Sequence, residues 1–299
     1  MKTEERVVPS AESLRFAYGT NGFGDHRLND AIRVLADLGY RGISLTLDHH
    51  HLDPYAPGLT RRVDAVRRTL DAAGLSVVVE TGARYLLDPW RKHRPTLLCG
   101  EGRELRIDLL RRAVDIASGL GAEAVHLWSG SAPEDVSEEL AWVRLVDGCA
   151  EVLGHAERAG VPIAFEPEPG MLVSDLAGYR RLCAALGTPD RFLLTLDIGH
   201  CQCVEPLPLE ECVYQSADRL AHVQIEDMYR GVHSHLPFGE GEIDFPPLLR
   251  ALAAIGYDGL VSVELPRHSH AATRTARTSL DFLRAAAAVH RPEESRSVR

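Results

Sequence analysis

Eight short runs of β-branched and apolar residues alternate along the chain with segments of helical periodicity, and this alternation constrains the fold more than any other feature. The helical segments include 28–40, 62–74, 105–121 and 145–160. Gly74, Gly121 and Gly160 stand at the ends of three such segments, which is typical of helix C-caps. The predicted strands are 14–20, 42–48, 75–81, 122–128, 161–168, 192–197, 220–227 and 259–265.

Strands and helices that alternate eight times predict a single (β/α)8 barrel of the TIM type, in the α/β class. No Pro/Gly/Ser-rich linker divides the chain, so we expect one domain over residues 13–289. Residues 1–12 and 290–299 are polar, and we expect them to be flexible tails. A doubly wound open sheet has the same alternation and is the structural alternative.

The net charge of −10 argues against a dedicated nucleic-acid binder and against attachment to a membrane surface, since both need a concentrated basic face. The first residues lack the apolar core of a signal peptide, and no apolar run reaches the roughly 18 residues that span a bilayer. We therefore expect a cytoplasmic protein whose six cysteines are reduced thiols. Lys2 and Lys92 are its two lysines, which nearly removes Schiff-base chemistry from consideration.

Acidic residues end several of the predicted late strands. Glu166, Asp197 and Glu264 stand at strand ends, and His222 and Gln224 share one face of the seventh strand. The ends of barrel strands meet at one mouth, where partly buried carboxylates repel one another unless a cation compensates them. A divalent metal is the simplest compensation, and pairing of each carboxylate with an arginine is the alternative.

Four motifs in this order and spacing resemble the xylose isomerase-like barrel superfamily, over roughly residues 14 to 286. That superfamily contains sugar isomerases, ketose 3-epimerases, inosose isomerases and dehydratases, and the metal nuclease endonuclease IV. The motifs are IAFEPEPG (163–170), LTLDIGH (194–200), HVQIED (222–227) followed by HLPFGEGEIDF (235–245), and SVEL (262–265).

The resemblance implies a divalent metal held by Glu166, Asp197, a residue of the seventh strand and Glu264. It also implies that Glu166 and Glu264 are the catalytic acid/base pair. In the epimerases of the family one glutamate removes the proton beside a ketose carbonyl, the metal stabilises the enediolate, and the other glutamate returns a proton on the opposite face.

The seventh strand departs from the family pattern HxHxxD. Gln224 stands where the second histidine is expected as a metal ligand, and His222 lies one layer deeper in the barrel. A glutamine binds hard metals through its amide oxygen, so the departure favours Mn or Mg over Zn, unless His222 reaches the metal instead. We expect a divalent ion, Mn first, with Mg, Co, Zn or Fe as alternatives, and no nucleotide cofactor.

A second departure is an excess of histidine after the seventh strand. His233 and His235 resemble the Asp-x-His pair that holds an extra zinc in endonuclease IV, together with a histidine that corresponds to His200. Three imidazoles beside Asp197 would make a second metal site, since imidazole suits Zn, Fe, Mn or Co. In the alternative, His233 and His235 are loop residues, and His200 and His235 contact substrate hydroxyls.

Other polar or aromatic residues near strand ends are candidates for substrate binding. Arginine offers forked donors to a phosphate or carboxylate, and an aromatic ring could stack on a sugar face. The candidates are Glu80, Arg84, His126, Trp128, Arg230 and Arg267.

The leading interpretation is a metal-dependent isomerase or epimerase of a small polyhydroxylated carbonyl compound, such as a sugar, a sugar phosphate or a cyclitol ketone. The first alternative is a multi-metal lyase, hydrolase or phosphoesterase that uses His200, His233 and His235. A catalytically silent barrel that only holds a metabolite is the third. For partners we expect a small-molecule substrate, no nucleic acid and no membrane, with a homodimer as the candidate assembly.

Overall fold

The fold is a closed eight-stranded parallel barrel, described by a computed structural model over residues 10–289. Around the ring the strands follow the order β1-β10-β7-β6-β5-β4-β3-β2. Because β1 pairs with both β10 and β2, the sheet has no edge, which excludes the doubly wound alternative. The strands are β1 (Arg15–Gly19), β2 (Gly42–Thr46), β3 (Ser76–Glu80), β4 (Val125–Trp128), β5 (Ile163–Glu166), β6 (Phe192–Asp197), β7 (Leu220–Ile225) and β10 (Leu260–Val263).

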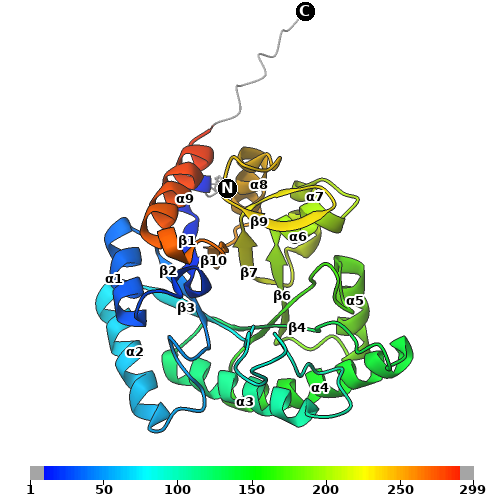
Figure 1. The fold of residues 1–299 in the computed structure, drawn as a ribbon. Helices are drawn as coiled ribbons and strands as arrows, with labels where there is room; N and C mark the ends of the chain where they lie inside the picture. Colours follow the sequence, from blue (N-terminus) through cyan, green and yellow to red (C-terminus); the bar gives the residue numbers. More distant parts are fainter. Residues whose placement is uncertain (1–9, 290–299) are drawn as a thin grey trace, which may run out of the picture.

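Helices surround the barrel, as Figure 1 shows. Their apolar stripes pack on the outer face of the sheet and form one continuous core with it. The predicted C-caps are confirmed, since Gly74, Gly121 and Gly160 end helices in the left-handed conformation. The helices are α1 (Leu28–Leu38), α2 (Leu59–Ala73), α3 (Arg103–Leu120), α4 (Glu138–Ala159), α5 (Leu176–Ala185), α6 (Ile198–Val204), α7 (Leu209–Ser216), α8 (Phe245–Ala254) and α9 (Ala272–Ala287).

A small antiparallel hairpin, β8 (Asp227–Tyr229) and β9 (Val232–Leu236), follows β7 and is separate from the ring. It lies beside α6, in the yellow part of Figure 1. Asp227 holds its base, because its carboxylate accepts hydrogen bonds from the backbone N–H groups of Met228, Gly239 and Ile243. The hairpin replaces the loop that the sequence suggested for His233 and His235.

Short 3-10 helices complete the fold: η1 (Ala11–Ser13), η2 (Thr20–Phe23) and η3 (Ser269–Ala271). Ala11 is buried, so regular structure reaches into the range predicted as the N-terminal tail. The rest of that tail, residues 1–9, and the predicted tail at 290–299 lie outside the described residues.

All six cysteines are free thiols, as predicted from their spacing. Among the helices of residues 10–289, none combines the length and the apolar character that crossing a membrane requires.

Candidate functional site

The strand register brings the acidic residues of the sequence motifs to one end of the barrel. Glu80, Glu166 and Asp197 are the last residues of β3, β5 and β6, and Glu264 directly follows β10. Neighbouring strands place Asp197 beside Gln224 and Glu80 beside His126. Parallel strands in a closed barrel point their carboxyl ends the same way, so these side chains meet at the mouth.

A cavity of about 560 Å³ opens at this mouth, within the usual size range for a small-molecule site. Its lining contains both carboxyl groups and imidazoles. The residues around it are Asn21, Thr46, Glu80, Gly82, Arg84, Tyr85, Lys92, His93, His126, Trp128, Glu166, Glu168, Met171, His200, Gln224, His233, His235, Glu264, Pro266 and Arg267.

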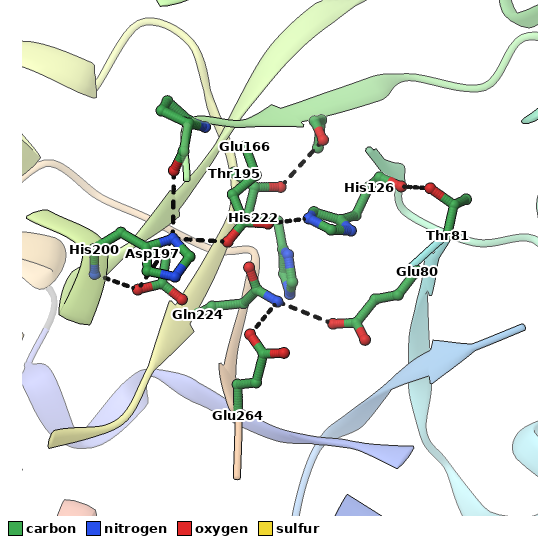
Figure 2. Close-up of polar contacts among 12 residues, drawn as sticks. Glu80, Thr81, His126, Glu166, Thr195, Asp197, His200, His222, Gln224 and Glu264 are labelled. Carbon is green, nitrogen blue, oxygen red and sulfur yellow. Dashed lines mark hydrogen bonds and ion pairs between the residues drawn. The ribbon is translucent and has the colours of Figure 1, made fainter. Parts of the chain in front are cut away.

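Glu166 is held between two imidazoles (Figure 2). Its Oε2 lies 2.6 Å from His126 Nε2, and its Oε1 lies 3.2 Å from His200 Nδ1. Burial alone would lower the pKa of His126, but the charge and hydrogen bond of Glu166 outweigh it and raise the pKa to about 9. Burial likewise opposes ionisation of Glu166, yet the two imidazoles hold its pKa well below the usual value. Glu166 is therefore a carboxylate at neutral pH.

Gln224 joins two further carboxyl groups (Figure 2). Its Nε2 donates to Glu264 Oε2 at 2.9 Å and to Glu80 Oε1 at 3.2 Å. The other Glu264 oxygen accepts a hydrogen bond from Asn21 Nδ2, and Thr46 Oγ1 donates to Glu80. Burial raises the pKa of Glu80, and it raises the pKa of Glu264 well above the ordinary range. Glu264 thus differs from Glu166, because its environment favours the protonated form.

The oxygen atoms at the centre of this group fit a divalent cation. Asp197 Oδ2 and Gln224 Oε1 are buried and have no hydrogen-bond partner among the described residues. Buried oxygen atoms of this kind are costly unless something compensates them, and hard cations such as Mn²⁺ and Mg²⁺ prefer oxygen ligands. One ligand atom each from Glu166, Asp197 and His200 lie within 4.8 Å of one another. The donor set therefore fits a metal ion.

A second cluster lies beside the first, where the hairpin meets α6. One nitrogen each from His200, His233 and His235 lie within 4.8 Å of one another, as do ligand atoms of Asp197, Glu226 and His235. The Nε2 of His200 and both carboxylate oxygens of Glu226 are buried without hydrogen-bond partners. Burial would lower the pKa of His235, but Glu226 raises it to about 10. The structure thus brings together the three histidines that the sequence singled out.

Three candidate residues, Asp197, His222 and Arg230, are not part of the cavity lining. His222 is fully buried below it, and its Nε2 is within hydrogen-bond distance of the Ser44 and Ser262 hydroxyls. Burial lowers its pKa to about 3, so it is neutral. Arg230 stands at the tip of the hairpin, where its guanidinium donates to the carbonyl of Glu205. The other proposed substrate contacts, Glu80, Arg84, His126, Trp128 and Arg267, all line the cavity.

Sequence reasoning missed several lining residues. Asn21 follows β1 and Thr46 ends β2, and both bind carboxylates of the site. Their positions at strand ends were a signal, although Asn and Thr are common in loops. His93 and Lys92 lie in a long loop after β3 whose path no sequence pattern indicated. Glu168 also faces the cavity, and burial together with the charge of Glu166 raises its pKa to about 7.

The chain is similar over most of its length to isomerases and epimerases. It is 23% identical to 2-oxo-tetronate isomerase of Cupriavidus necator over 81% of this chain and 88% of that protein. It is 24% identical to L-ribulose-5-phosphate 3-epimerase of Salmonella typhimurium over 79% of this chain and 81% of that protein. The structure of 3-keto-D-glucoside 4-epimerase from E. coli superposes with a TM-score of 0.73 at 18% identity, covering 91% of this chain and 99% of that one. A family model described as a xylose isomerase-like TIM barrel matches residues 32–286, and the chain belongs to this family.

Proposed function

We propose that this protein is a divalent-metal-dependent isomerase or epimerase of a small polyhydroxylated carbonyl compound: a sugar, a sugar phosphate or a cyclitol ketone. One observation carries the proposal. Glu166 and Glu264 line the same cavity, and their pKa values are shifted in opposite directions. Between them lie buried oxygen atoms of Asp197 and Gln224 that have no hydrogen-bond partner among the described residues and are suited to binding a metal. The names of the two relatives support it, since each describes the isomerisation or epimerisation of a small hydroxylated carbonyl compound.

The two glutamates would move the proton. Glu166, ionised at neutral pH, removes the proton from the carbon beside the substrate carbonyl and leaves an enediolate. Glu264, whose pKa is raised by burial, is protonated and returns a proton to the opposite face of that carbon. Donation from Asn21 and Gln224 fixes the Glu264 carboxyl group in place.

Glu166, Asp197 and Gln224 would hold the ion, and Glu264 would join them when it is ionised. Mn²⁺ is our first choice because three of the four side chains offer carboxylate oxygens and the fourth an amide oxygen. When bound, the ion would polarise the substrate carbonyl and offset the repulsion between the carboxylates.

The test is exchange of substrate hydrogen with solvent in D₂O, together with metal analysis of untagged protein. Glu166→Gln and Glu264→Gln should each lower kcat by about 10²- to 10⁴-fold. Glu157→Gln, on the exposed surface of α4, is the matched control and should leave activity unchanged. Full activity in both site variants would refute the role of these two groups.

The second candidate is a multi-metal lyase, hydrolase or phosphoesterase. The close approach of His200, His233 and His235 beside Asp197 and Glu226 favours it. Metal analysis separates the two: one equivalent of Mn, Mg or Co supports the epimerase, and two or more of Zn or Fe support the alternative. Protein without bound metal and without hydrogen exchange would indicate a silent barrel.

A further inference from the structure

Charges in the cavity are separated by depth. The carboxyl groups of Glu80 and Glu166 lie at strand ends on the floor and are buried. Three cationic side chains come instead from loops around the opening: Arg84 and Lys92 after β3, and Arg267 after β10. A ligand that fills the cavity would thus meet the charge-balanced Glu166–His126 pair and the Glu80 carboxyl group at one end, and unpaired positive charge at the other.

The three cations have no acidic partner in the part of the chain that the structure describes. Within residues 10–289, no carboxylate oxygen lies within 4.0 Å of a side-chain nitrogen of Arg84, Lys92 or Arg267. Among the described residues, the Arg84 guanidinium donates to the backbone carbonyl of Asn21. By contrast, Arg91 in the same loop pairs with Asp88 at 2.6 Å. In a chain with a net charge of −10, these three cations make the opening of the cavity locally positive, which favours an anionic ligand.

The loop that carries two of them is fixed from beneath by Arg106. This buried guanidinium on α3 donates to the backbone carbonyls of Thr81, His93 and Pro95. It also lies over the ring of Trp128, 4.9 Å from the ring centroid. The loop backbone that carries two of the cations is therefore fixed before a ligand arrives, which lowers the entropic cost of binding.

His93 lies in the same loop, close to the positive charges of Lys92, Arg106 and Arg84. Its Nδ1 donates to the carbonyl of Gly82 at 2.6 Å, and its ring meets Trp128 edge-on. Burial, together with the charges of Lys92, Arg106 and Arg84, lowers the pKa of His93 to about 4. The imidazole is neutral, and its single N–H is used in the hydrogen bond to Gly82.

We propose that the substrate carries an anionic group, a phosphate or a carboxylate, which Arg84, Lys92 and Arg267 bind at the opening while its carbonyl end reaches the carboxylate floor. Arginine suits this role because its forked donors match phosphate and carboxylate oxygens. The cavity of about 560 Å³ has room for a small substrate of this kind. The inference rests on the proposed function, of which it names the substrate class.

A binding experiment tests the anion site without turnover. Titration calorimetry of the purified protein would compare inorganic phosphate with sulfate, and D-erythronate with the neutral polyol erythritol. The triple variant Arg84→Gln/Lys92→Gln/Arg267→Gln should weaken binding of the anions by about 10-fold or more, because hydrogen bonds to charged groups are the strong ones. Arg91→Gln is the matched control, since it removes one positive charge from the same loop outside the cavity lining, and it should bind as wild type.

A kinetic experiment distinguishes the two anions. D-ribulose 5-phosphate would be compared with D-ribulose, and a 2-oxo-tetronate with the matching neutral tetrulose, in wild type and in the triple variant. The anionic member of at least one pair should have the higher kcat/KM in wild type, and the triple variant should lose that preference mainly through KM. The pair that shows the preference identifies phosphate or carboxylate.

The failures are distinguishable. Equal binding of anions by wild type and triple variant, or a higher kcat/KM for the neutral compounds, would overturn the anion site and leave the isomerase proposal intact. Selective anion binding lost in the triple variant, without turnover of any compound, would support the anion site and count against the isomerase. Circular-dichroism melting of the triple variant verifies that it is folded.

Discussion

Replacing Glu166 by glutamine should remove an ionised pair from the barrel interior. Glu166 and His126 are both buried, and 2.6 Å separates Glu166 Oε2 from His126 Nε2. Glutamine keeps the shape of the side chain but cannot carry the negative charge that holds a proton on His126. The imidazole should therefore become neutral, as burial alone dictates.

The magnitude follows from the pKa of His126, which rises from 6.5 to about 9 in the folded protein. That rise corresponds to about 3 kcal/mol of stabilisation of the protonated form. The lowered pKa of Glu166 reports the same pair, so the interaction is counted once. Because the pKa of His126 is raised, this stabilisation is fully present below about pH 6.5 and is lost as the pH rises through about 9.

Urea unfolding of EDTA-treated protein at a series of pH values measures the effect. Wild type should exceed Glu166→Gln by about 3 kcal/mol near pH 6, and the difference should shrink toward zero by about pH 10. Glu157→Gln, which changes an exposed carboxylate, should show little difference at any pH. A difference between wild type and Glu166→Gln that is the same at pH 6 and pH 10 would refute the ionised pair.

Three further predictions concern packing and metal. Gly199→Ala should lower the free energy of unfolding by about 1–3 kcal/mol, because a Cβ there would collide with the Glu226 carboxylate; urea midpoints measure this, and an unchanged midpoint would contradict the close packing. Phe192→Ala should cost about 3–5 kcal/mol in the same assay, since this fully buried ring packs against Phe165; a loss under 1 kcal/mol would mean that the site collapses without a cavity. Removal of metal by EDTA should lower Tm, and Mn²⁺ at about 1,000 times its Kd should restore about 4 kcal/mol; a Tm that ignores both treatments would argue against a metal at the floor.

The barrel was predictable because its signals are local and repeated. Each strand is a short apolar run, each intervening helix has its own periodicity, and glycines such as Gly121 and Gly160 mark the helix ends. The acidic strand ends could also be located, since the barrel brings all of them to one mouth. Each strand, helix and strand end has its own local sequence pattern, so these features can be located from one sequence.

The missed features depend on contacts between distant segments. The hairpin strand VHSHL pairs with β8 and not with the barrel, so its side chains do not enter the barrel core. Its sequence therefore lacks the apolar run that indicates the barrel strands. The amide of Gln224 donates to Glu80 and Glu264, which stand at the ends of two other strands. The presence of glutamine where the family pattern has histidine could not indicate these hydrogen bonds. The guanidinium of Arg106 on α3 donates to backbone carbonyls of the loop that precedes this helix. The sequence does not indicate these contacts, because they form only when the loop folds back over α3.

The separate hairpin has a consequence for how this site can change in evolution. The ring closes through β7 and β10 and does not use β8 or β9 for any of its pairings. Substitutions at His233 or His235 can therefore alter the ligands offered beside Asp197 while leaving closure of the ring intact. The carboxylates of the floor stand on strands that close the barrel, so their positions are fixed by the fold. The histidines of β9 stand outside the ring and can be replaced in evolution without disturbing it.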